Sequence, residues 1–413
     1  MKLIRNILIS IFKKVNKKLL FIRQKEIDLK KVDYILINSL YFIGDTIFHT
    51  PVFELLRQIF PKAKIDIWIK SRNYEVVRYN PVFNEIIIFD NIKTADYNET
   101  NKLDFWKKFS FLKMIRSKKY DLYIDLTGKY STALFALLGK MKYSAGINYH
   151  GFGFCYNKYY ELDTSNTRGH LIDKYMSVVK NIFSMEEGYW NELISKTGNN
   201  PYLYSDSISR GSVTEMLDRE IPYSDKPLIC IHVSAGWKAK ELNTRKIGLL
   251  SEKIITSGKY DLVLIGSEAD KGKLPEIQDA LTNAVIDINR LFYSLPLLST
   301  IELIKMTDLF IGPDSAPLHI SGAVGTPSIA LFGPTNPEFS KPRGKDNIVV
   351  YNKLYCSAGE NEQFCTRNAG KSCKTLDCME SINIDIMYEQ IVKFFDKSKL
   401  MPKRRQRTEL EKA

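Results

Sequence analysis

The feature that most constrains the fold of this 413-residue chain is an alternation of apolar strands and helices that runs once, stops and restarts. Strands separated by helices form a parallel sheet with both faces covered, so the chain is predicted to be an α/β protein. The first run has strands predicted at Tyr34–Asn38, Ile65–Ile69, Glu85–Phe89 and Leu122–Leu126, and helical patterns near 46–60, 102–117 and 131–139.

A segment rich in Gly, Asn, Ser, Asp and Pro, residues 186–226, interrupts the alternation and holds one weak helical pattern. The second run has strands predicted at 228–233, 262–265, 309–311 and 328–331, and helices at 244–257, 299–306, 317–324 and 384–396. We expect two Rossmann-like domains over 32–222 and 223–383, then a C-terminal helix at 384–396. Two such domains commonly bind ligands in the cleft between them.

The net charge of +13 is concentrated at the two ends of the chain. Residues 1–31 hold ten Lys and Arg against two acidic residues, and the basic tail at 397–413 holds seven against two, so the body from 32 to 396 is neutral. A nucleic-acid-binding protein usually carries its basic patch on the folded domain, so we expect no nucleic-acid partner. Basic ends suit an acidic membrane surface.

Residues 2–23 have apolar side chains at helical spacing with lysines mostly off that stripe, which indicates a basic amphipathic helix within 1–31. Such a helix suits a membrane interface, and the alternative is that it packs on the protein or on a second copy. No segment approaches the roughly 20 apolar residues that span a bilayer. Lys13-Lys14 stand where a signal peptide would have its cleavage site. We expect a cytoplasmic protein, peripheral on the inner face of the cytoplasmic membrane.

Gly44 and Asp45 follow the first predicted strand, and in open α/β sheets ligands bind beyond the C-terminal ends of the strands. A carboxylate there can act as a general base, and Gly44 permits a tight turn and the close approach of a ligand. Thr46 supports this loop. The alternative is that Asp45 only caps the following helix. Because the chain has no G-x-G-x-x-G at this place, a dinucleotide-binding loop is not expected.

Three further motifs follow strands of the second run. In Gly312–His319, Pro317 stands in a first helical turn whose free N–H groups and dipole suit a phosphate, and Ser315 adds a hydroxyl. In His232–Lys240, Lys240 can neutralise a diphosphate. Glu268 can accept hydrogen bonds from ribose hydroxyls. The alternative for Gly312–His319 is a simple helix N-cap, and for His232–Lys240 it is a surface loop with solvated lysines. The alternative for Glu268 is an exposed glutamate without a ligand. Because each motif ends a parallel strand, we expect them to face one crevice.

Four of the six cysteines crowd into one segment, at Cys356, Cys365, Cys373 and Cys378. Four thiols can hold a structural Zn²⁺, although this spacing lacks the usual C-x2-C pair. The alternatives are free or redox-variable thiols and disulfides, and disulfides are disfavoured in the cytosol.

The chain contains neither D-x-D nor H-E-x-x-H. We therefore expect no catalytic divalent metal and no cofactor. The remaining cysteines, Cys155 and Cys230, are isolated and are expected to be buried thiols.

In this order and spacing the motifs resemble glycosyltransferase family 9, the bacterial heptosyltransferases of lipopolysaccharide core assembly. The resemblance covers about 33–380 and also rests on Thr50-Pro51, Tyr120–Gly128, Gly325–Pro327 and Leu331–Thr335. It implies a GT-B fold, in which two Rossmann-like domains face a central cleft. It also implies metal-independent, inverting transfer from a nucleotide sugar, typically ADP-heptose, to a lipid-linked saccharide.

The same resemblance implies roles for individual residues. Asp45 is the implied catalytic base, which takes the proton from an acceptor hydroxyl as that hydroxyl attacks the anomeric carbon. Lys240 and the helix start at 315–319 would stabilise the departing nucleoside diphosphate. The implied donor site consists of Ser234, Ala235, Lys240, Glu268, Asp314, Ser315, Ala316 and His319.

Two positions depart from the family pattern. Ser39 stands where members often carry a basic residue, and Ala316 stands where Gly is usual. The N-terminal extension of about 30 residues is also outside the pattern. The alternatives are a transferase of the same fold that uses a UDP- or GDP-sugar, a catalytically lapsed homologue that serves as a membrane assembly factor, and an epimerase of the same architecture.

Overall fold

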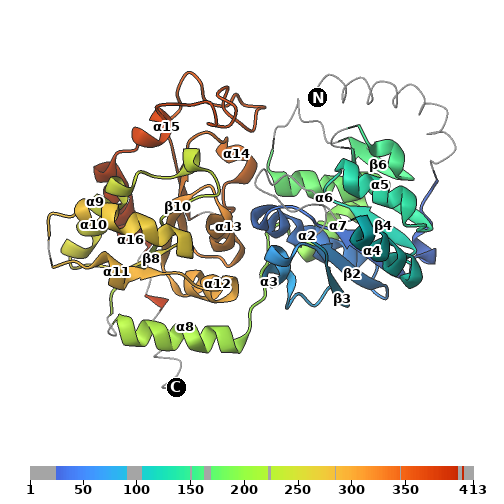
Figure 1. Cartoon of the computed structure of the whole chain (residues 1–413), viewed down its shortest axis with the longest axis horizontal. Coiled ribbons are helices and arrows are strands. Elements are labelled where there is room, and N and C mark those ends of the chain that lie inside the picture. The colour runs from blue at the N-terminus through green and yellow to red at the C-terminus, as the bar shows by residue number, and fades with distance from the viewer. Residues whose placement is uncertain are drawn as a thin grey trace. The chain divides into compact units, whose positions relative to one another are not determined.

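The computed structural model describes residues 25–90, 105–148, 151–161, 169–221, 225–283, 285–344, 346–398 and 402–403. These residues form two compact units (Figure 1). The first unit comprises the described residues of Met1–Thr164 and Leu171–Tyr204, and the second those of Ser165–His170 and Ser205–Ala413. The basic helix expected within 1–31 and the basic tail at 397–413 lie mostly outside the described residues. Within the described part, no helix has the length and apolar character that crossing a membrane requires.

The first unit is built on a six-stranded sheet in the order β3-β2-β1-β4-β5-β6. All neighbouring strands pair in parallel. This is the 3-2-1-4-5-6 order of a Rossmann sheet, whose direction of growth reverses between β1 and β4 and leaves a crevice at the C-terminal ends of those strands. The strands are β1 (Tyr34–Asn38), β2 (Lys64–Ile69), β3 (Glu85–Ile88), β4 (Leu122–Asp125), β5 (Tyr143–Asn148) and β6 (Lys158–Glu161).

Helices cover both faces of this sheet. On one face α4 (Phe105–Lys118) and α5 (Tyr130–Leu138) enclose an aromatic core in which the Trp68 ring lies 4.7 Å from both Phe111 and Phe135. The helix between β1 and β2, α2 (Ile43–Ile59), packs against α6 (Leu171–Ile182) and α7 (Glu187–Thr197). The shorter helical elements are η1 (Leu29–Lys31), η2 (Ser71–Asn73), α3 (Tyr74–Val77) and η3 (Gly153–Cys155).

Helix α2 contains a proline, Pro51, in its interior. Proline has no N–H, so the carbonyl of Ile47, four residues earlier, loses its helical partner. The hydroxyl of Thr50 donates to that carbonyl at 2.8 Å and accepts a hydrogen bond from the backbone N–H of Tyr202 at 2.9 Å. Thr50 therefore repairs the helix and ties it to the segment that follows α7.

The second unit repeats the same sheet, in the order β12-β11-β10-β7-β8-β9 with all strands parallel. The reversal falls between β7 and β10, the first and fourth strands of this unit along the chain, so its crevice lies at their C-terminal ends. The strands are β7 (Leu228–His232), β8 (Asp261–Ile265), β9 (Phe292–Tyr293), β10 (Leu309–Pro313), β11 (Ser328–Phe332) and β12 (Asn347–Tyr351). The predicted α/β class with two Rossmann-like halves is confirmed.

Around this sheet, α9 packs against α10 and α16, and α12 packs against α8 and α13. One apolar core joins α9, α10 and α16 to the strands. The helical elements are α8 (Ser207–Glu220), η4 (Lys238–Lys240), α9 (Thr244–Thr256), η5 (Glu268–Lys273), α10 (Leu274–Asp279), α11 (Ile288–Leu291), α12 (Leu297–Met306), α13 (Ala316–Ala323), α14 (Pro337–Ser340), α15 (Asp377–Glu380) and α16 (Ile384–Ser398).

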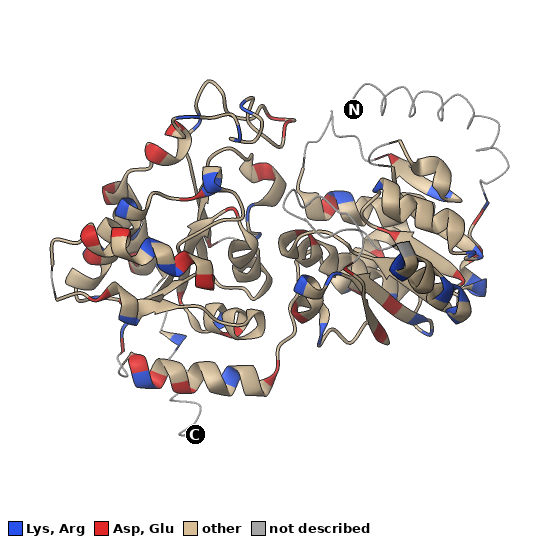
Figure 2. Ribbon diagram, in the orientation of Figure 1, with Lys and Arg blue, Asp and Glu red and all other residues tan. Residues whose placement is uncertain are grey.

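The segment 186–226 differs from its expectation, because it holds two helices, α7 and α8, rather than one weak pattern. The contacts divide the chain after Tyr204, earlier than the expected boundary at 222, because α8 packs against α12 and so belongs to the second unit. Acidic and basic side chains are interspersed over both units (Figure 2), in keeping with the neutral charge of the body between the two tails.

Candidate functional site

Asp45 lies in the first turn of α2, directly beyond β1. The N-cap of this helix is Phe42, which has no side-chain cap, so Asp45 does not occupy the capping position. The helix dipole stabilises a negative charge in a first turn and so favours the ionised carboxylate that can accept a proton. The tight turn expected at Gly44 is wrong, because the helix already begins at Ile43 and Gly44 has no positive φ.

A chain of hydrogen bonds between buried polar side chains holds the helical turn that carries Asp45. Thr46 is fully buried, and its hydroxyl accepts hydrogen bonds from the Ser39 hydroxyl at 3.4 Å and from the Asn73 amide. The Ser39 hydroxyl also lies 2.8 Å from Nδ1 of His49. Burial lowers the pKa of His49 to about 3, so this imidazole is neutral at neutral pH. Ser39 is therefore part of a buried and uncharged hydrogen-bond chain.

A second buried network joins the C-terminal ends of β1 and β4. The Asp125 carboxylate accepts hydrogen bonds from the Asn38 amide at 2.9 Å, from the Thr127 N–H and hydroxyl at 2.8 and 2.7 Å, and from the Tyr156 hydroxyl at 2.6 Å. Burial raises the pKa of Tyr156, and the neighbouring Asp125 raises it further, which keeps the phenol a donor. Each of these polar groups has a hydrogen-bond partner, so this part of the Tyr120–Gly128 motif rigidly joins the C-terminal ends of β1 and β4.

Two cations lie beside the Asp45 turn, and the sequence analysis did not identify either of them. The Arg72 guanidinium, in η2 beyond β2, lies 5.0 Å from the Phe42 ring. The Lys129 ammonium, beyond β4, lies 4.5 Å from the Tyr41 ring. Three neighbouring strand ends therefore contribute one carboxylate and two cations to this crevice.

In the second unit, a buried ion pair organises the candidate donor site. Nζ of Lys240 lies 2.6 Å from Oδ2 of Asp314, with the two side chains 15% and 6% exposed. The hydroxyls of Thr335 and Ser340 donate to the same carboxylate at 2.8 and 3.2 Å, and Nε2 of His319 lies 3.4 Å from Oδ1. Burial alone would raise the pKa of Asp314, but the Lys240 and His319 contacts outweigh it and hold that pKa well below its usual range. Asp314 is thus an anchor that positions its neighbours.

The helix that follows β10, α13, begins after Ser315, which is the N-cap but makes no side-chain cap hydrogen bond. Pro317 stands in the first turn, as expected. The first N–H groups of a helix have no partner within it, so those of Ala316 and Leu318 are available to an anion. This helix start is next to Asp314 in sequence, and the Lys240 ion pair therefore lies beside it.

A half-buried histidine, His232, connects two loops of this site. Its Nδ1 lies 3.2 Å from the Ser315 hydroxyl, and its Nε2 lies 3.4 Å from the Ser234 hydroxyl. Burial lowers the pKa of His232 to about 4, with Asp270 opposing and Lys273 reinforcing the shift. The ring is therefore neutral at neutral pH and bridges two hydroxyls without adding charge to the site.

The loop after β8 carries two carboxylates, one exposed and one buried. Glu268 is exposed and pairs with Nζ of Lys271 at 2.7 Å. Asp270 is buried, forms a capping box with Ser267 and accepts a hydrogen bond from the Ser234 hydroxyl at 2.9 Å. Asp270 is thus the residue that ties this loop to the loop after β7. The pattern Ser267-x-x-Asp270 was the signal that could have identified it.

The loop after β7 carries a half-buried indole beside the Lys240 ammonium. The Trp237 ring centre lies 4.4 Å from Nζ of Lys240, 5.6 Å from Nζ of Lys371 and 5.7 Å from the Phe364 ring. The N–H of Ala235 donates to a carboxylate oxygen of Glu241 at 3.3 Å. Apart from Glu268, which follows β8, the residues of the candidate donor site lie in the segments that follow β7 and β10.

Comparisons with known proteins identify the family of this chain. The sequence model of glycosyltransferase family 9 (heptosyltransferase) matches residues 108–368. Lipopolysaccharide heptosyltransferase 3 of Escherichia coli is 25% identical over 342 residues, which are 79% of this chain and 89% of that protein.

Two solved structures have the same two-domain fold. The family 9 glycosyltransferase of Veillonella parvula DSM 2008 matches with a TM-score of 0.74 and 20% identity, over 91% of this chain and 99% of that one. The ADP-heptose lps heptosyltransferase II of E. coli matches with a TM-score of 0.68 and 18% identity, over 89% and 100%. The fold is therefore GT-B, and the chain belongs to glycosyltransferase family 9 and is a glycosyltransferase.

Proposed function

We propose that this enzyme transfers heptose from ADP-heptose to a lipopolysaccharide core or related glycolipid, with inversion and without a metal ion. The observation that carries the proposal is the Lys240–Asp314 pair beside the start of α13. A fixed cation next to free helical N–H groups is what a departing nucleoside diphosphate requires. Two relatives that match over 89% and 87% of their own length are named lipopolysaccharide heptosyltransferase 3 and lipopolysaccharide heptosyltransferase 2, which favours heptose and an acceptor of that kind.

On the donor side, Lys240 and the first N–H groups of α13 take the two phosphates, with the Ser315 hydroxyl as a further donor. The Trp237 indole is half-buried beside Lys240 and offers a surface on which a nucleobase can stack. Glu268 is exposed at the end of β8 and accepts from ribose hydroxyls. In this proposal Asp314 binds no ligand and keeps Lys240 in place.

On the acceptor side, Asp45 accepts the proton of the attacking hydroxyl, and the oxygen displaces the nucleoside diphosphate from the anomeric carbon in one step. Arg72 and Lys129 lie near the Asp45 turn and suit an acceptor that carries negative charge. These two cations are also an alternative source of the positive charge that other members place at the position of Ser39.

The donor is tested by measuring the binding of ADP-heptose, UDP-sugars and GDP-sugars to the full chain, followed by mass analysis of glycolipid acceptors. We expect ADP-heptose to bind at least about tenfold more tightly, a difference of about 1.4 kcal/mol. The glycolipid should gain the mass of one heptose. Tight binding of UDP- or GDP-sugars alone would exclude ADP-heptose as the donor.

The same assay separates the other candidate functions. A lapsed homologue that serves as an assembly factor would give no product with any donor. An epimerase would change the sugar of the donor in the absence of acceptor. Transfer that requires both substrates excludes both of these alternatives.

We further propose that the basic tails hold the enzyme on the inner face of the cytoplasmic membrane. Helix α5 exposes an apolar stripe of Tyr130, Leu134 and Leu138, which is compatible with contact between this helix and lipid. Removing residues 1–31 should shift the protein from the membrane fraction to the soluble fraction, and raised salt should do the same to the intact chain. Membrane retention that neither change affects would contradict electrostatic attachment.

A further inference from the structure

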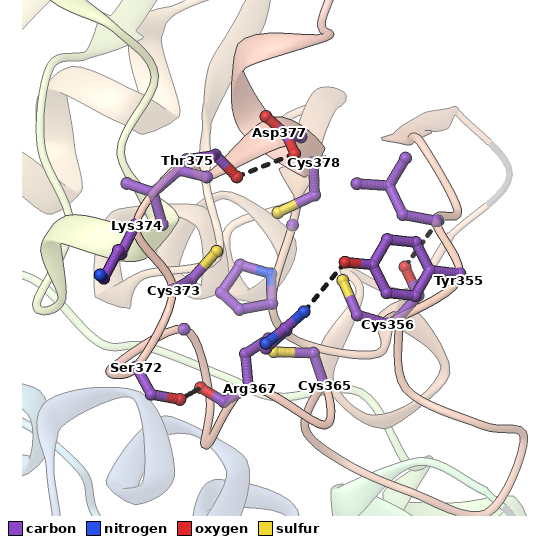
Figure 3. A pocket seen from close by; sticks show the side chains of 16 residues that line it. Tyr355, Cys356, Cys365, Arg367, Ser372, Cys373, Lys374, Thr375, Asp377 and Cys378 are labelled. Carbon is purple, nitrogen blue, oxygen red and sulfur yellow. Dashed lines mark hydrogen bonds between the residues drawn. The ribbon is translucent and has the colours of Figure 1, made fainter.

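The four clustered cysteines of the second unit line a cavity of about 310 Å³, and Figure 3 shows their side chains around it. They are the free thiols Cys356, Cys365, Cys373 and Cys378. As the side chains stand, no three His, Cys, Asp or Glu in the described ranges converge to hold a metal ion. The surface of the first unit carries a stronger indication of a binding partner.

Helix α4 carries apolar side chains on two of its sides. The inner side contributes Phe111 and Ile115 to the aromatic core of the first unit. On the outer side, Trp106 is 73% exposed and Phe109 is 52% exposed. Trp106, Phe109 and the exposed Lys113 are spaced three and four residues apart, so they lie along one side of the helix. Two large aromatic rings therefore point away from the core that the other side of the helix builds.

Helix α5 extends this apolar surface. Its outer side chains Tyr130, Leu134 and Leu138 recur every four residues and are between 37% and 62% exposed. The two helices are neighbours (Figure 1), because Nε of Arg116 in α4 donates to the carbonyl of Leu138 at 2.8 Å. Their outer surface, which we call the α4–α5 face, thus carries five large apolar side chains. Apolar patches on the surface of a soluble protein mark interaction sites.

The chain that forms the α4–α5 face is also strongly basic. Residues 105–142 contain nine Lys and Arg against two acidic residues, a net charge of +7. Because the body from 32 to 396 is neutral, the rest of it has a net charge of −7. Of the two acidic residues, Asp125 is buried and Asp121 accepts hydrogen bonds from two backbone N–H groups. Lys118 pairs with a glutamate of β3, whereas the segment itself offers little acidic charge to balance its other cations.

The described end of the basic N-terminal extension joins the first unit beside this face. Nζ of Lys142, which follows α5, donates to the carbonyl of Lys31 at 3.3 Å. The ammonium groups of Lys25 and Lys142 lie 4.9 and 5.4 Å from the centre of the Tyr143 ring. Further positive charge is therefore added next to the C-terminal end of α5.

We propose that the α4–α5 face docks on an anionic phospholipid surface, with Trp106 and Phe109 at the level of the headgroups and the basic side chains around them. Aromatic rings prefer membrane interfaces, and Lys and Arg are attracted to anionic lipids. A second copy of this chain fits less well, because a symmetric contact would bring two faces of like charge together. This docking is separate from attachment by the two tails, because it uses side chains of the folded unit.

The docking gives the Asp45 crevice an orientation, and this consequence rests on the proposed function. Helix α5 begins at Tyr130, directly after Lys129, the cation beside the Asp45 turn. The apolar stripe of α5 therefore starts at the crevice and leads away from it. A glycolipid acceptor keeps its lipid part in the bilayer, so its saccharide would enter the crevice from the side on which the α4–α5 face meets the membrane.

The test uses the full chain and vesicles of phosphatidylcholine with about 30% phosphatidylglycerol, whose negative charge attracts basic surfaces. Brominated acyl chains in these vesicles quench the fluorescence of a tryptophan that enters the bilayer. We expect the unaltered chain to sediment with the vesicles and to be quenched. Trp106→Tyr keeps an aromatic ring at this place but removes the indole, so binding should remain while the quenching is lost.

Two double variants separate the apolar and the basic parts of the face. Trp106→Ser with Phe109→Ser should weaken vesicle binding about tenfold or more, because two large rings no longer leave water. Lys113→Gln with Lys140→Gln should weaken it by about 10- to 30-fold, and raised salt should reduce the difference. Ile386→Ser, a control at an exposed apolar side chain of α16 in the second unit, should bind as the unaltered chain does.

Lys259→Gln with Lys393→Gln removes the same charge from exposed positions of the second unit and should also leave binding unchanged. Vesicle binding without quenching, or quenching that Trp106→Tyr leaves intact, would overturn the proposal, because the enzyme would then be held by its tails alone. A dimer that Trp106→Ser with Phe109→Ser converts to a monomer, without vesicle binding, would assign the face to a second copy instead. None of these measurements involves sugar transfer, so they stand apart from any failure of the proposed function.

Discussion

Asp45→Asn is expected to lower the rate of sugar transfer by about 10²–10⁴-fold, the usual contribution of a general base. The amide has nearly the shape of the carboxylate but cannot take a proton from the acceptor hydroxyl. Asp45 lies in the first turn of α2 and is not its N-cap, so the helix should form without it. Donor affinity should stay close to that of the unaltered enzyme, because Asp45 is assigned to the acceptor.

The measurement is the initial rate of product formation with saturating donor, together with donor affinity by titration. Glu85→Gln is a matched control, because it makes the same carboxylate-to-amide change at the first residue of β3. Glu85 lies at the N-terminal ends of the strands, whereas Asp45 lies beyond their C-terminal ends. We expect it to retain normal activity. If Asp45→Asn transferred sugar at the normal rate, Asp45 could not be the base.

Asp314→Ala is expected to destabilise the second unit by about 3–5 kcal/mol, the cost of removing one partner from a buried ion pair. The change leaves the Lys240 ammonium without its partner at 2.6 Å and removes the acceptor of the Thr335 and Ser340 hydroxyls. Donor affinity should fall as well, because the carboxylate that holds Lys240 beside α13 is lost and only the carbonyl of residue 314 and the Trp237 ring still contact its ammonium. Urea unfolding, followed by circular dichroism, and donor titration measure the two effects.

Two comparisons make this result interpretable. Glu268→Gln removes an exposed pair with Lys271 and should change stability by no more than about 0.5–1 kcal/mol. The double variant Asp314→Leu with Lys240→Met removes both charges and should recover part of the lost stability, because no unpaired charge remains. Equal stability of Asp314→Ala and Glu268→Gln would contradict the role of Asp314 as an anchor.

The sequence predicted the fold well where strands are continuous apolar runs. Tyr34–Asn38 was predicted with its observed bounds, because a central parallel strand is buried on both faces. The strand β5 was missed because four of its six residues, Ser144, Ala145, Gly146 and Asn148, are small or polar and interrupt the apolar pattern. Its Gly146 is required by packing, since an added Cβ would lie 2.7 Å from the Tyr156 ring. Such a requirement arises only in three dimensions.

The sequence predicted that the donor-site residues follow the ends of strands, but it did not predict the hydrogen bonds and ion pairs that join them. The motifs identified Lys240 and Asp314 separately, whereas their ion pair joins positions 74 residues apart. His232 was part of a recognised motif, yet its link to Ser315 across 83 positions gave no signal in the sequence. Hydrogen-bond partners of this kind depend on which strands become neighbours, and the order of strands in the sheet is not readable from periodicity.

The repaired helix α2 has a consequence for reading the family's sequence markers. Pro51 removes an amide, and the Thr50 hydroxyl takes over the stranded Ile47 carbonyl while it also receives the Tyr202 N–H. The two residues therefore act as one structural unit, because losing the proline would restore a competing N–H and losing the hydroxyl would leave two backbone groups without this partner. Thr50-Pro51 therefore has a structural role in helix α2, and a relative with the same pair need not transfer the same sugar.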